Sequence, residues 1–431
     1  MDSGSIAWRS VLAHITILAL GSRGDVQPLV ALGVGLQKAG YQVRLAASEN
    51  FETLVRDRGL EFALLRGDVQ EYLQSPAGQK FSQSRDPIAL APRIPEMFTG
   101  FFASAIPDCW QACQGTDAIV AGSATFFWSV DIAEALSIPL YAAVLQPLSP
   151  TAAFPNILFP PVFGRLGGGF NRFSYAFAYR LIWYFCRQPV NHFRTTVLNL
   201  APVRKTPLER MYRQGAHILN AVSPSVLPRP QDWGEQDHMT GYWFLDRPSD
   251  FVPPPDLVDF LAAGEPPVYI GFGSMSGAEA RKVANLALAA LEKTGQRGLF
   301  LTGWSNIDTS NLPDTIFKLR SIPHDWLFPQ VACVVHHGGA GTTAATLRAG
   351  IPGVVIPFLA DQPFWADRVF RLGVSPAPVT PKKRTVEQVA TAIVEAVQNQ
   401  DMIKKATQLG EKIRAEDGVA QTIAMIQKHC P

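Results

Sequence analysis

The sequence predicts an α/β protein with two parallel β-sheets, each flanked by helices. Three observations lead to this prediction. Short apolar runs alternate with helical segments over residues 11–145, and the same alternation restarts over residues 266–373. Strands that alternate with helices form parallel sheets, because a parallel neighbour is reached only through a crossover connection. The chain of 431 residues is also longer than one hydrophobic core normally supports, which favours two or three domains.

The first predicted domain opens with an apolar strand at residues 11–20, a loop at residues 21–28 and a helix that stops at Gly40. Further elements are expected as strands at residues 41–48, 117–123 and 138–145 and a helix at residues 129–137. Between residues 150 and 200, aromatic and basic side chains crowd together and interrupt the alternation.

Residues 223–256 are rich in proline and acidic residues and lack periodicity, which is typical of an interdomain connection, so we place a boundary near residue 245. Beyond it, strands are expected at residues 266–275, 298–304, 317–322, 331–339 and 351–358, and helices at residues 278–295, 341–350 and 362–373 and from 386 to the end. We predict two doubly wound, Rossmann-like domains, 1–245 and 246–405, that face a central cleft, and a helical tail, 406–431, that packs back across this cleft.

Composition excludes some classes of function. Lysine and arginine total 38 and aspartate and glutamate total 36, so the net charge of +2 gives no electrostatic reason to expect a nucleic-acid partner. The five cysteines are scattered and lack the paired spacing of a zinc site, which favours a reducing, cytoplasmic location. No window approaches the roughly 18 apolar residues that span a bilayer, so contact with a membrane would be peripheral.

Two glycine-rich loops follow predicted strands of the second domain, at residues 271–274 and 336–343. A helix N-terminus after such a loop directs backbone amides at an anion, and two such loops suit a diphosphate. The candidate groups are the hydroxyl of Ser274 and the amides of Gly339, Gly341 and Thr342. A tight strand-to-helix turn also needs glycine without any ligand, so this structural alternative stays open.

His337 lies in the second glycine loop and would add an imidazole donor for phosphate oxygens. The alternative is a core histidine bonded to a carbonyl group. Asp361 and Gln362 follow the predicted strand at residues 351–358, where a carboxylate and an amide would bind adjacent hydroxyls of a hexose. An ordinary helix cap followed by a polar residue is the alternative for this pair.

Asp25 lies in the loop of the first domain, directly before a predicted helix with Pro28 in its first turn. One interpretation is an N-cap aspartate. The other is a general base, kept ionised by the helix N-terminus and effective through its position. No Asp-x-Asp sequence occurs in the chain, so we expect leaving-group charge to be met by amides, hydroxyls and His337 without a metal.

Aromatic clusters in the first domain are candidates for an apolar acceptor pocket: Phe101, Phe102, Phe126, Phe127 and Trp128. Plain core packing is the alternative for these rings. Arg172, Arg180 and Arg187 lie among further aromatics and would suit a membrane surface.

Three segments resemble one known family. Residues 324–379, with HDWLFPQVACVVHHGGAGTTAATLRAGIPGVVIPFLADQPFW, are similar to the donor-site signature of the sterol glucosyltransferase branch of the UDP-glycosyltransferases. Residues 21–41 and 241–275 resemble the same branch. The resemblance implies the GT-B fold, a donor such as UDP-glucose held mostly by the second domain, a lipophilic acceptor such as a sterol in the first, inversion of configuration, and no cofactor or metal.

By position in this family, His337, Thr342 and Ser274 would contact the diphosphate, and Asp361 with Gln362 would bind the sugar. Asp25 falls where plant relatives carry a catalytic histidine, so the resemblance implies a carboxylate base. The chain departs from the plant pattern at Ala345, where a ribose-binding glutamate is expected, and near Gly122, the place of the aspartate that supports the plant histidine.

The sequence is also compatible with other functions. The acceptor is alternatively a polyketide, terpenoid or other secondary-metabolite aglycone. A sugar-nucleotide epimerase would share paired Rossmann-like domains but need no acceptor pocket, and a nucleotide-sugar-binding protein would need no base. We expect a cytoplasmic protein, with peripheral association with a membrane as an open alternative.

Overall fold

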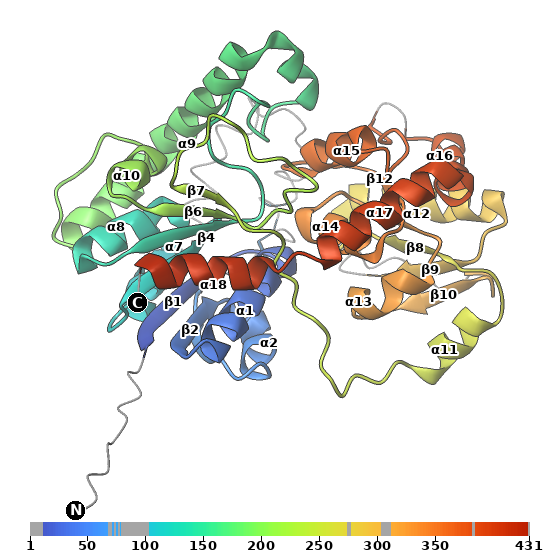
Figure 1. Cartoon of the computed structure of the whole chain (residues 1–431), viewed down its shortest axis with the longest axis horizontal. Coiled ribbons are helices and arrows are strands. Elements are labelled where there is room, and N and C mark those ends of the chain that lie inside the picture. Colours follow the sequence, from blue (N-terminus) through green and yellow to red (C-terminus); the bar gives the residue numbers. More distant parts are fainter. Residues whose placement is uncertain are drawn as a thin grey trace, which may run out of the picture.

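The computed structural model describes residues 12–67, 103–273, 277–302, 312–381 and 384–429, together with residues 71, 72, 75 and 78. The chain forms two α/β domains that lie side by side (Figure 1). Each domain contains one parallel sheet with helices around it, so the predicted fold class is confirmed.

The first sheet has seven parallel strands in the described part of the chain, in the order β3-β2-β1-β4-β5-β6-β7. The strands are β1 (Leu12–Ala19), β2 (Tyr41–Ala47), β3 (Glu61–Leu64), β4 (Ala118–Gly122), β5 (Leu140–Val144), β6 (His217–Asn220) and β7 (Asp237–Met239). Ile17 of β1 pairs with Leu45 of β2 and with Val120 of β4. All three side chains are fully buried, because helices cover both faces of the sheet.

The helices of this domain are α1 (Arg23–Lys38), η1 (Glu49–Phe51), α2 (Glu52–Arg56), α7 (Ala103–Ala112), α8 (Phe126–Leu136), η4 (Pro161–Leu166), α9 (Gly168–Thr196) and α10 (Pro207–Arg213). Helix α9 projects beyond the sheet toward the upper edge of the molecule in Figure 1.

The second sheet has five parallel strands among the described residues, in the order β10-β9-β8-β11-β12. The strands are β8 (Val268–Gly271), β9 (Gly298–Leu301), β10 (Ile316–Leu319), β11 (Cys333–His336) and β12 (Gly353–Val355). The helices that follow the boundary are α11 (Pro255–Ala262), α12 (Gly277–Thr294), α13 (His324–Leu327), η5 (Phe328–Gln330), α14 (Ala340–Ala349), α15 (Gln362–Arg371), α16 (Val386–Gln398), α17 (Gln400–Arg414) and α18 (Gly418–His429).

The order of the strands fixes where a ligand can bind. In the first sheet the chain runs from β1 outward to β3 and then returns to the other side of β1 with β4. In the second sheet it does the same from β8 to β10 and back to β11. The loops after β1 and β4, and after β8 and β11, therefore diverge, and ligands of open α/β sheets bind at such switch points.

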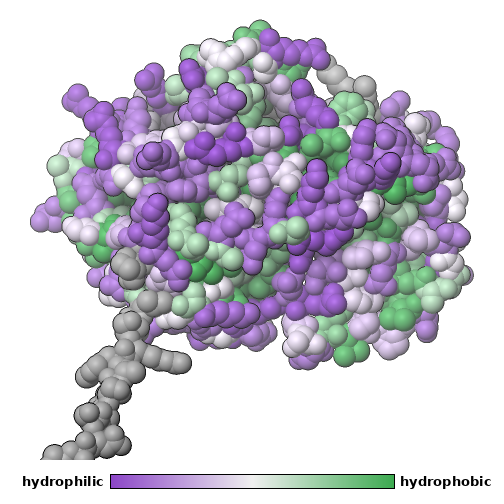
Figure 2. Space-filling view, viewed as in Figure 1, coloured by the Kyte–Doolittle hydropathy of each residue, from purple (hydrophilic) through white to green (hydrophobic). Residues whose placement is uncertain are grey.

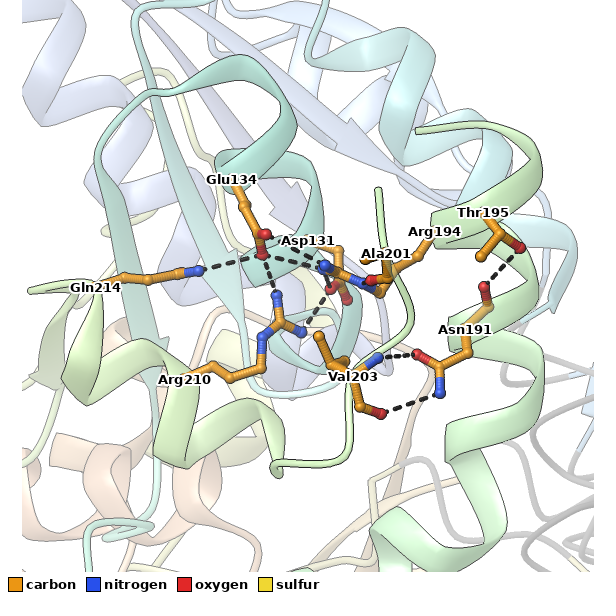
Figure 3. A network of polar contacts seen from close by, with 9 residues as sticks. All are labelled: Asp131, Glu134, Asn191, Arg194, Thr195, Ala201, Val203, Arg210 and Gln214. Atoms are coloured by element: carbon orange, nitrogen blue, oxygen red, sulfur yellow. Dashed lines mark hydrogen bonds and ion pairs between the residues drawn. The ribbon is translucent and has the colours of Figure 1, made fainter. Parts of the chain in front are cut away.

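A buried ionic network fastens α9 to the first domain (Figure 3). Asp131 of α8 is fully buried and accepts hydrogen bonds from Arg194 of α9 and Arg210 of α10. Glu134, one turn further along α8, pairs with Arg194 at 3.0 Å and with Arg210 at 2.6 Å. The C-terminal half of α9 is thus held by charge-assisted hydrogen bonds to a neighbouring helix.

The last two helices of the chain pack on different domains. Helix α17 packs on α14 in the second domain, whereas α18 packs on α1 in the first. The predicted boundary at residue 245 falls between β7 and α11, and the one at residue 405 falls inside α17. None of the described helices is both long and apolar enough to cross a membrane.

Candidate active site

The loop after β1 places Asp25 in the first turn of α1. The helix begins at Arg23, so Ser22 is the N-cap and Asp25 is the third helical residue. The Ser22 amide and hydroxyl donate to Asp25 Oδ2 at 2.8 and 2.9 Å. The N-cap alternative for Asp25 is wrong, because Ser22 is the cap, and the first-turn position expected for Pro28 is wrong, because Pro28 lies inside the helix. Asp25 and Ser22 form a capping box, which holds the Asp25 carboxylate next to the N-cap residue Ser22.

The surroundings of Asp25 tune its protonation. Burial of the carboxylate raises the pKa of Asp25, and the hydrogen bonds from Ser22 lower it. Gly21 has φ of +149°, and a Cβ at this position would lie 2.5 Å from Asp25 Oδ2. Only glycine therefore fits this turn without displacing the carboxylate.

The loop after β11 presents backbone amides from the N-terminus of α14. Gly339 is the N-cap residue and no side chain caps this helix. The backbone of Ala340, the first residue of this helix, lies near Asp361 and lowers the pKa of its carboxyl group. The amides of Gly341 and Thr342 in the same first turn point from a helix N-terminus, which is an anion-binding arrangement.

The imidazole of His337 lies between two glycine turns. An added Cβ on Gly339 would lie 2.5 Å from His337 Nε2, and one on Gly273 would lie 3.0 Å from its Cε1. Among the described residues, His337 Nδ1 has no hydrogen-bond partner. Burial lowers the pKa of His337 to about 4, so the ring is neutral at physiological pH and has one N–H to donate. Ser274, next to Gly273, lies outside the described residues.

Asp361 is the N-cap of α15 in the second domain, and it lies near enough to Asp25 for the charge of Asp25 to raise its pKa. Trp365 Nε1 donates to Asp361 Oδ2 at 2.8 Å. Burial, followed by the charge of Asp25, raises the pKa of Asp361 to about 6. Ala360 before it has φ of 58°, a left-handed conformation that is strained for a residue with a Cβ. Backbone strain at this turn is typical of a functional site.

Gln362 is buried and its side-chain oxygen accepts hydrogen bonds from the amides of Phe358 and Leu359, at 2.7 and 3.2 Å. This oxygen holds the loop after β12 in place. The predicted contact of Gln362 with a sugar hydroxyl stays a prediction.

The loops of the two domains meet at the switch points. A Cβ on Gly341 would lie 3.9 Å from the Cα of Gly24. Helices α1 and α14 contact each other, and the charge of Asp25 acts on Asp361. The structure thus brings Asp25, Asp361 and the amide-bearing turn of α14 to one interdomain junction, with His337 in the loop that leads into α14.

The five aromatic residues predicted to line an acceptor pocket do not all lie in the same environment. Phe126 and Trp128 lie in the core of the first domain, and Trp128 is fully buried. Phe127 is half-buried and stacks on Phe126 with ring centroids 4.3 Å apart. These positions give Trp128 a core-packing role. Phe101 and Phe102 lie outside the described residues.

Two residues of the junction are missing from the sequence prediction. Ser22 precedes Asp25 by three positions, and this spacing of a capping box was the available signal. Trp365 follows Asp361 by four positions, which on a helix places the indole above the carboxylate. No group of three or more metal-ligating side chains occurs among the described residues.

Comparison with known proteins identifies the family. Residues 15–155 match the glycosyltransferase family 28 N-terminal domain, and residues 300–426 match the C-terminal domain of erythromycin biosynthesis protein CIII-like proteins. Two sterol 3-beta-glucosyltransferases of Arabidopsis thaliana are 36% and 34% identical over 97% of this chain, and the chain spans 66% and 68% of their lengths. A sterol 3-beta-glucosyltransferase of Sclerotinia sclerotiorum is 37% identical over 96% of the chain, which spans 29% of that protein.

Solved structures give the fold. CalG4, the calicheamicin glycosyltransferase, superimposes with a TM-score of 0.65 at 15% identity and covers 97% of this chain and 98% of its own. The Streptomyces glycosyltransferase SsfS6 complexed with thymidine diphosphate superimposes with a TM-score of 0.64 at 19% identity, covering 96% and 99%. The architecture is therefore GT-B. With sequence identity above a third along nearly its whole length, the chain belongs to the sterol 3-beta-glucosyltransferase-like branch of the UDP-glycosyltransferase family.

Proposed function

We propose that this protein transfers glucose from UDP-glucose to the hydroxyl of a sterol, with inversion at the anomeric carbon and without a metal. The observation that carries the proposal is the junction itself. The Asp25 carboxylate of the first domain lies in a helix that contacts α14, whose first-turn amides no side chain caps and which follows the loop that carries the neutral imidazole of His337. The names of the plant and fungal relatives support a sterol as the acceptor.

Asp25 acts as the general base in this proposal. Ser22 binds Oδ2, so Oδ1 receives the proton of the acceptor hydroxyl. The acceptor oxygen forms a bond to the anomeric carbon as the bond from that carbon to the diphosphate breaks, and UDP leaves with the bonding electrons. A single displacement of this kind inverts the configuration. The raised pKa of Asp25 makes it a better base than an exposed aspartate.

The negative charge of the departing UDP is met by neutral donors. The amides of Gly341 and Thr342 and the dipole of α14 favour an anion at this point. His337 donates its single N–H, and Ser274 is expected to add a hydroxyl. Such pre-oriented donors replace the cation that a metal-dependent transferase uses, which is the basis for proposing metal independence.

Asp361 binds the sugar in this proposal. Trp365 fixes Oδ2, and the remaining lone pairs accept hydrogen bonds from hydroxyls of the glucose ring. Because the pKa of Asp361 is about 6, the group is mostly ionised at neutral pH and serves as an acceptor.

The proposal is tested by incubating the purified protein with UDP-glucose and a panel of sterols, hopanoids, polyketides and simple lipophilic alcohols. We expect mass spectrometry to show a gain of one hexose on sterols, and NMR of the product to show a β-linkage. UDP release should depend on the acceptor and persist in EDTA.

Other outcomes would replace this function. Conversion of UDP-glucose into another sugar nucleotide without acceptor would indicate an epimerase, and UDP-glucose binding without any product would indicate a binding protein. A hexose gain on polyketides but not on sterols would reassign the acceptor. Loss of UDP release in EDTA, restored by a divalent cation, would overturn metal independence.

A further inference from the structure

A solvent-facing apolar patch lies where α9 projects from the first domain. Six large apolar side chains of η4, α9 and the turn before them are exposed: Leu158, Val162, Phe163, Leu166, Phe173 and Phe177. We call these six residues the η4–α9 face. Leu166 and Phe173 are 64% and 56% exposed, which is unusual for side chains of this size on a soluble surface. Figure 2 shows hydrophobic residues on the surface at the upper edge of the molecule, where this end of α9 lies in Figure 1.

The rings of this region form one connected cluster. Phe170 contacts Phe159, Phe163 and Phe173, with ring centroids 5.8 to 6.2 Å apart. Phe173 continues the chain to Phe177 at 5.9 Å. The exposed side chains therefore belong to a contiguous aromatic surface that extends from η4 along two turns of α9.

Helix α9 carries aromatic side chains on its buried face and also on its exposed face. Its buried face includes Tyr175, Tyr179 and Trp183, which pack in the domain core. Its exposed stripe carries Phe173, Phe177, Arg180, Tyr184 and Arg187, at intervals of three and four residues. Arg187 lies over the ring of Tyr184 at 5.0 Å. Along this stripe the aromatic rings can enter the headgroup region of a bilayer, while the neighbouring arginines can reach lipid phosphates.

The segment that contains η4 and α9 is positively charged, which favours binding to a negatively charged surface. From residue 135 to residue 208 the chain has no aspartate or glutamate, whereas the whole chain is nearly neutral with a net charge of +2. Over the same stretch it carries Arg165, Arg172, Arg180, Arg187, Arg194, Arg204 and Lys205. Arg194 is buried in the ionic network and Arg172 pairs with Asp232 at 3.0 Å. Arg165, Arg180 and Arg187 are exposed beside the apolar side chains.

The η4–α9 face lies close to α15, which begins at the interdomain junction. Phe154, which leads into this segment, packs edge-on against Phe364 of α15 at 5.4 Å. Helix α15 begins directly after Asp361, and η4 contacts α15. The buried network attaches the other end of α9, at Arg194, to α8. A surface that binds the η4–α9 face would therefore lie next to the proposed sugar-binding helix.

We propose that the η4–α9 face docks on the surface of an anionic lipid bilayer, with its aromatic and aliphatic side chains in the headgroup region and its arginines against lipid phosphates. None of the six side chains belongs to the proposed catalytic or donor-binding groups, and docking needs no donor or turnover. Binding to a bilayer is therefore measured independently of the proposed glucosyl transfer, and either proposal can fail while the other holds.

The experiment measures co-sedimentation of the full chain with sucrose-loaded vesicles of phosphatidylcholine, with and without 30% phosphatidylglycerol, in the absence of nucleotide and sterol. We expect binding to the anionic vesicles that weakens with added salt, and much weaker binding to neutral ones. The double variant Phe173→Ser/Phe177→Ser should bind at least about tenfold more weakly. The double variant Arg180→Gln/Arg187→Gln should lose roughly tenfold on anionic vesicles only.

Matched controls keep the test specific. Phe370→Ser removes an exposed ring from α15, and Lys404→Gln/Lys412→Gln removes two exposed charges from α17. Both should bind like the unmodified chain, and all variants should keep its melting temperature. No binding to anionic vesicles, equal binding to neutral ones, or undiminished binding of the phenylalanine double variant would overturn the proposal. Absent vesicle binding together with dimerisation that the phenylalanine variant abolishes would assign the face to a second copy of the chain.

Discussion

Replacing Asp25 can test its proposed role as a general base without removing the side chain that Ser22 holds in place. Ser22 holds one oxygen from two donors, and asparagine would keep the shape of the side chain at this position. Because the amide of Asn does not accept a proton, we expect Asp25→Asn to lower kcat by about 10²- to 10⁴-fold. UDP affinity, measured by calorimetry, should be unchanged, since the diphosphate donors lie in the second domain. Turnover at the unmodified rate would remove Asp25 from the mechanism.

Ser22 should act through the pKa of Asp25. Burial raises this pKa and the Ser22 hydrogen bonds oppose the increase, so Ser22→Ala should raise the pKa of Asp25 further. The base works in its ionised form, and activity is lost as pH falls through its pKa. The acidic limb of the kcat/KM profile should therefore move to higher pH, by roughly one unit.

Ser22→Thr retains the hydroxyl and is the matched control, with an acidic limb close to that of the unmodified enzyme. A limb that stays in place in Ser22→Ala, with lower activity at every pH, would mean that Ser22 only caps the helix.

Several individual site residues were foreseeable, and the exceptions have physical reasons. Asp25, His337 and Asp361 each follow a strand of a parallel sheet, and the chain pattern alone places such loops at one edge. Whether a polar group faces a ligand or the backbone depends on rotamers that sequence spacing does not fix. Gln362 is the example, because its oxygen turns back to the amides of its own loop. Trp128 is another, since the helical phase of α8 turns it into the core.

The ionic network between α8, α9 and α10 is the element-scale feature with the largest expected energetic effect. Asp131 is fully buried between two arginines, so Asp131→Asn would leave both guanidinium groups with Glu134 as their remaining carboxylate in the network. Breaking a buried pair by removing one partner typically costs about 3–5 kcal/mol. We expect a loss of this size in the free energy of unfolding, measured in urea.

Glu61→Gln breaks the exposed pair of Glu61 with Arg44 and provides the comparison. Its expected effect is about 0–1 kcal/mol, because solvent screens a surface pair. Equal losses in the two variants would show that the α8–α9–α10 network is not a stabilising feature.

The alternation of apolar strands and helices in the sequence did not predict α9 or β7. Helix α9 runs for 29 residues, yet its exposed stripe is as aromatic as its buried face, so amphipathic periodicity is hidden. Strand β7 has three residues, Asp237–Met239, inside the segment interpreted as a linker. It is a strand because it pairs with β6 at the edge of the sheet, a long-range contact that local composition does not contain.

At the scale of the whole molecule, the two domains are joined by two crossings of the chain that pack on each other. Glu416, between α17 and α18, accepts hydrogen bonds from Ser223 and Ser225 of the first domain at 2.8 and 2.9 Å. Trp243, in the connection after β7, donates to Thr422 of α18 at 2.9 Å. These contacts tie the last helix to the first domain and so set the relative position of the two halves of the junction.

Gly418 packs directly against the backbone of the other crossing, at Gly241 and Tyr242. A Cβ on Gly418 would lie 2.5 Å from the Tyr242 carbonyl oxygen and 2.6 Å from that of Gly241, so backbone must move. We expect Gly418→Ala to destabilise the protein by about 1–3 kcal/mol and to speed hydrogen exchange in α18. Gly169→Ala, in open space at the start of α9, should not destabilise the protein and should leave hydrogen exchange in α18 unchanged. Unaltered protection of α18 in Gly418→Ala would show that the crossing yields without loosening the helix.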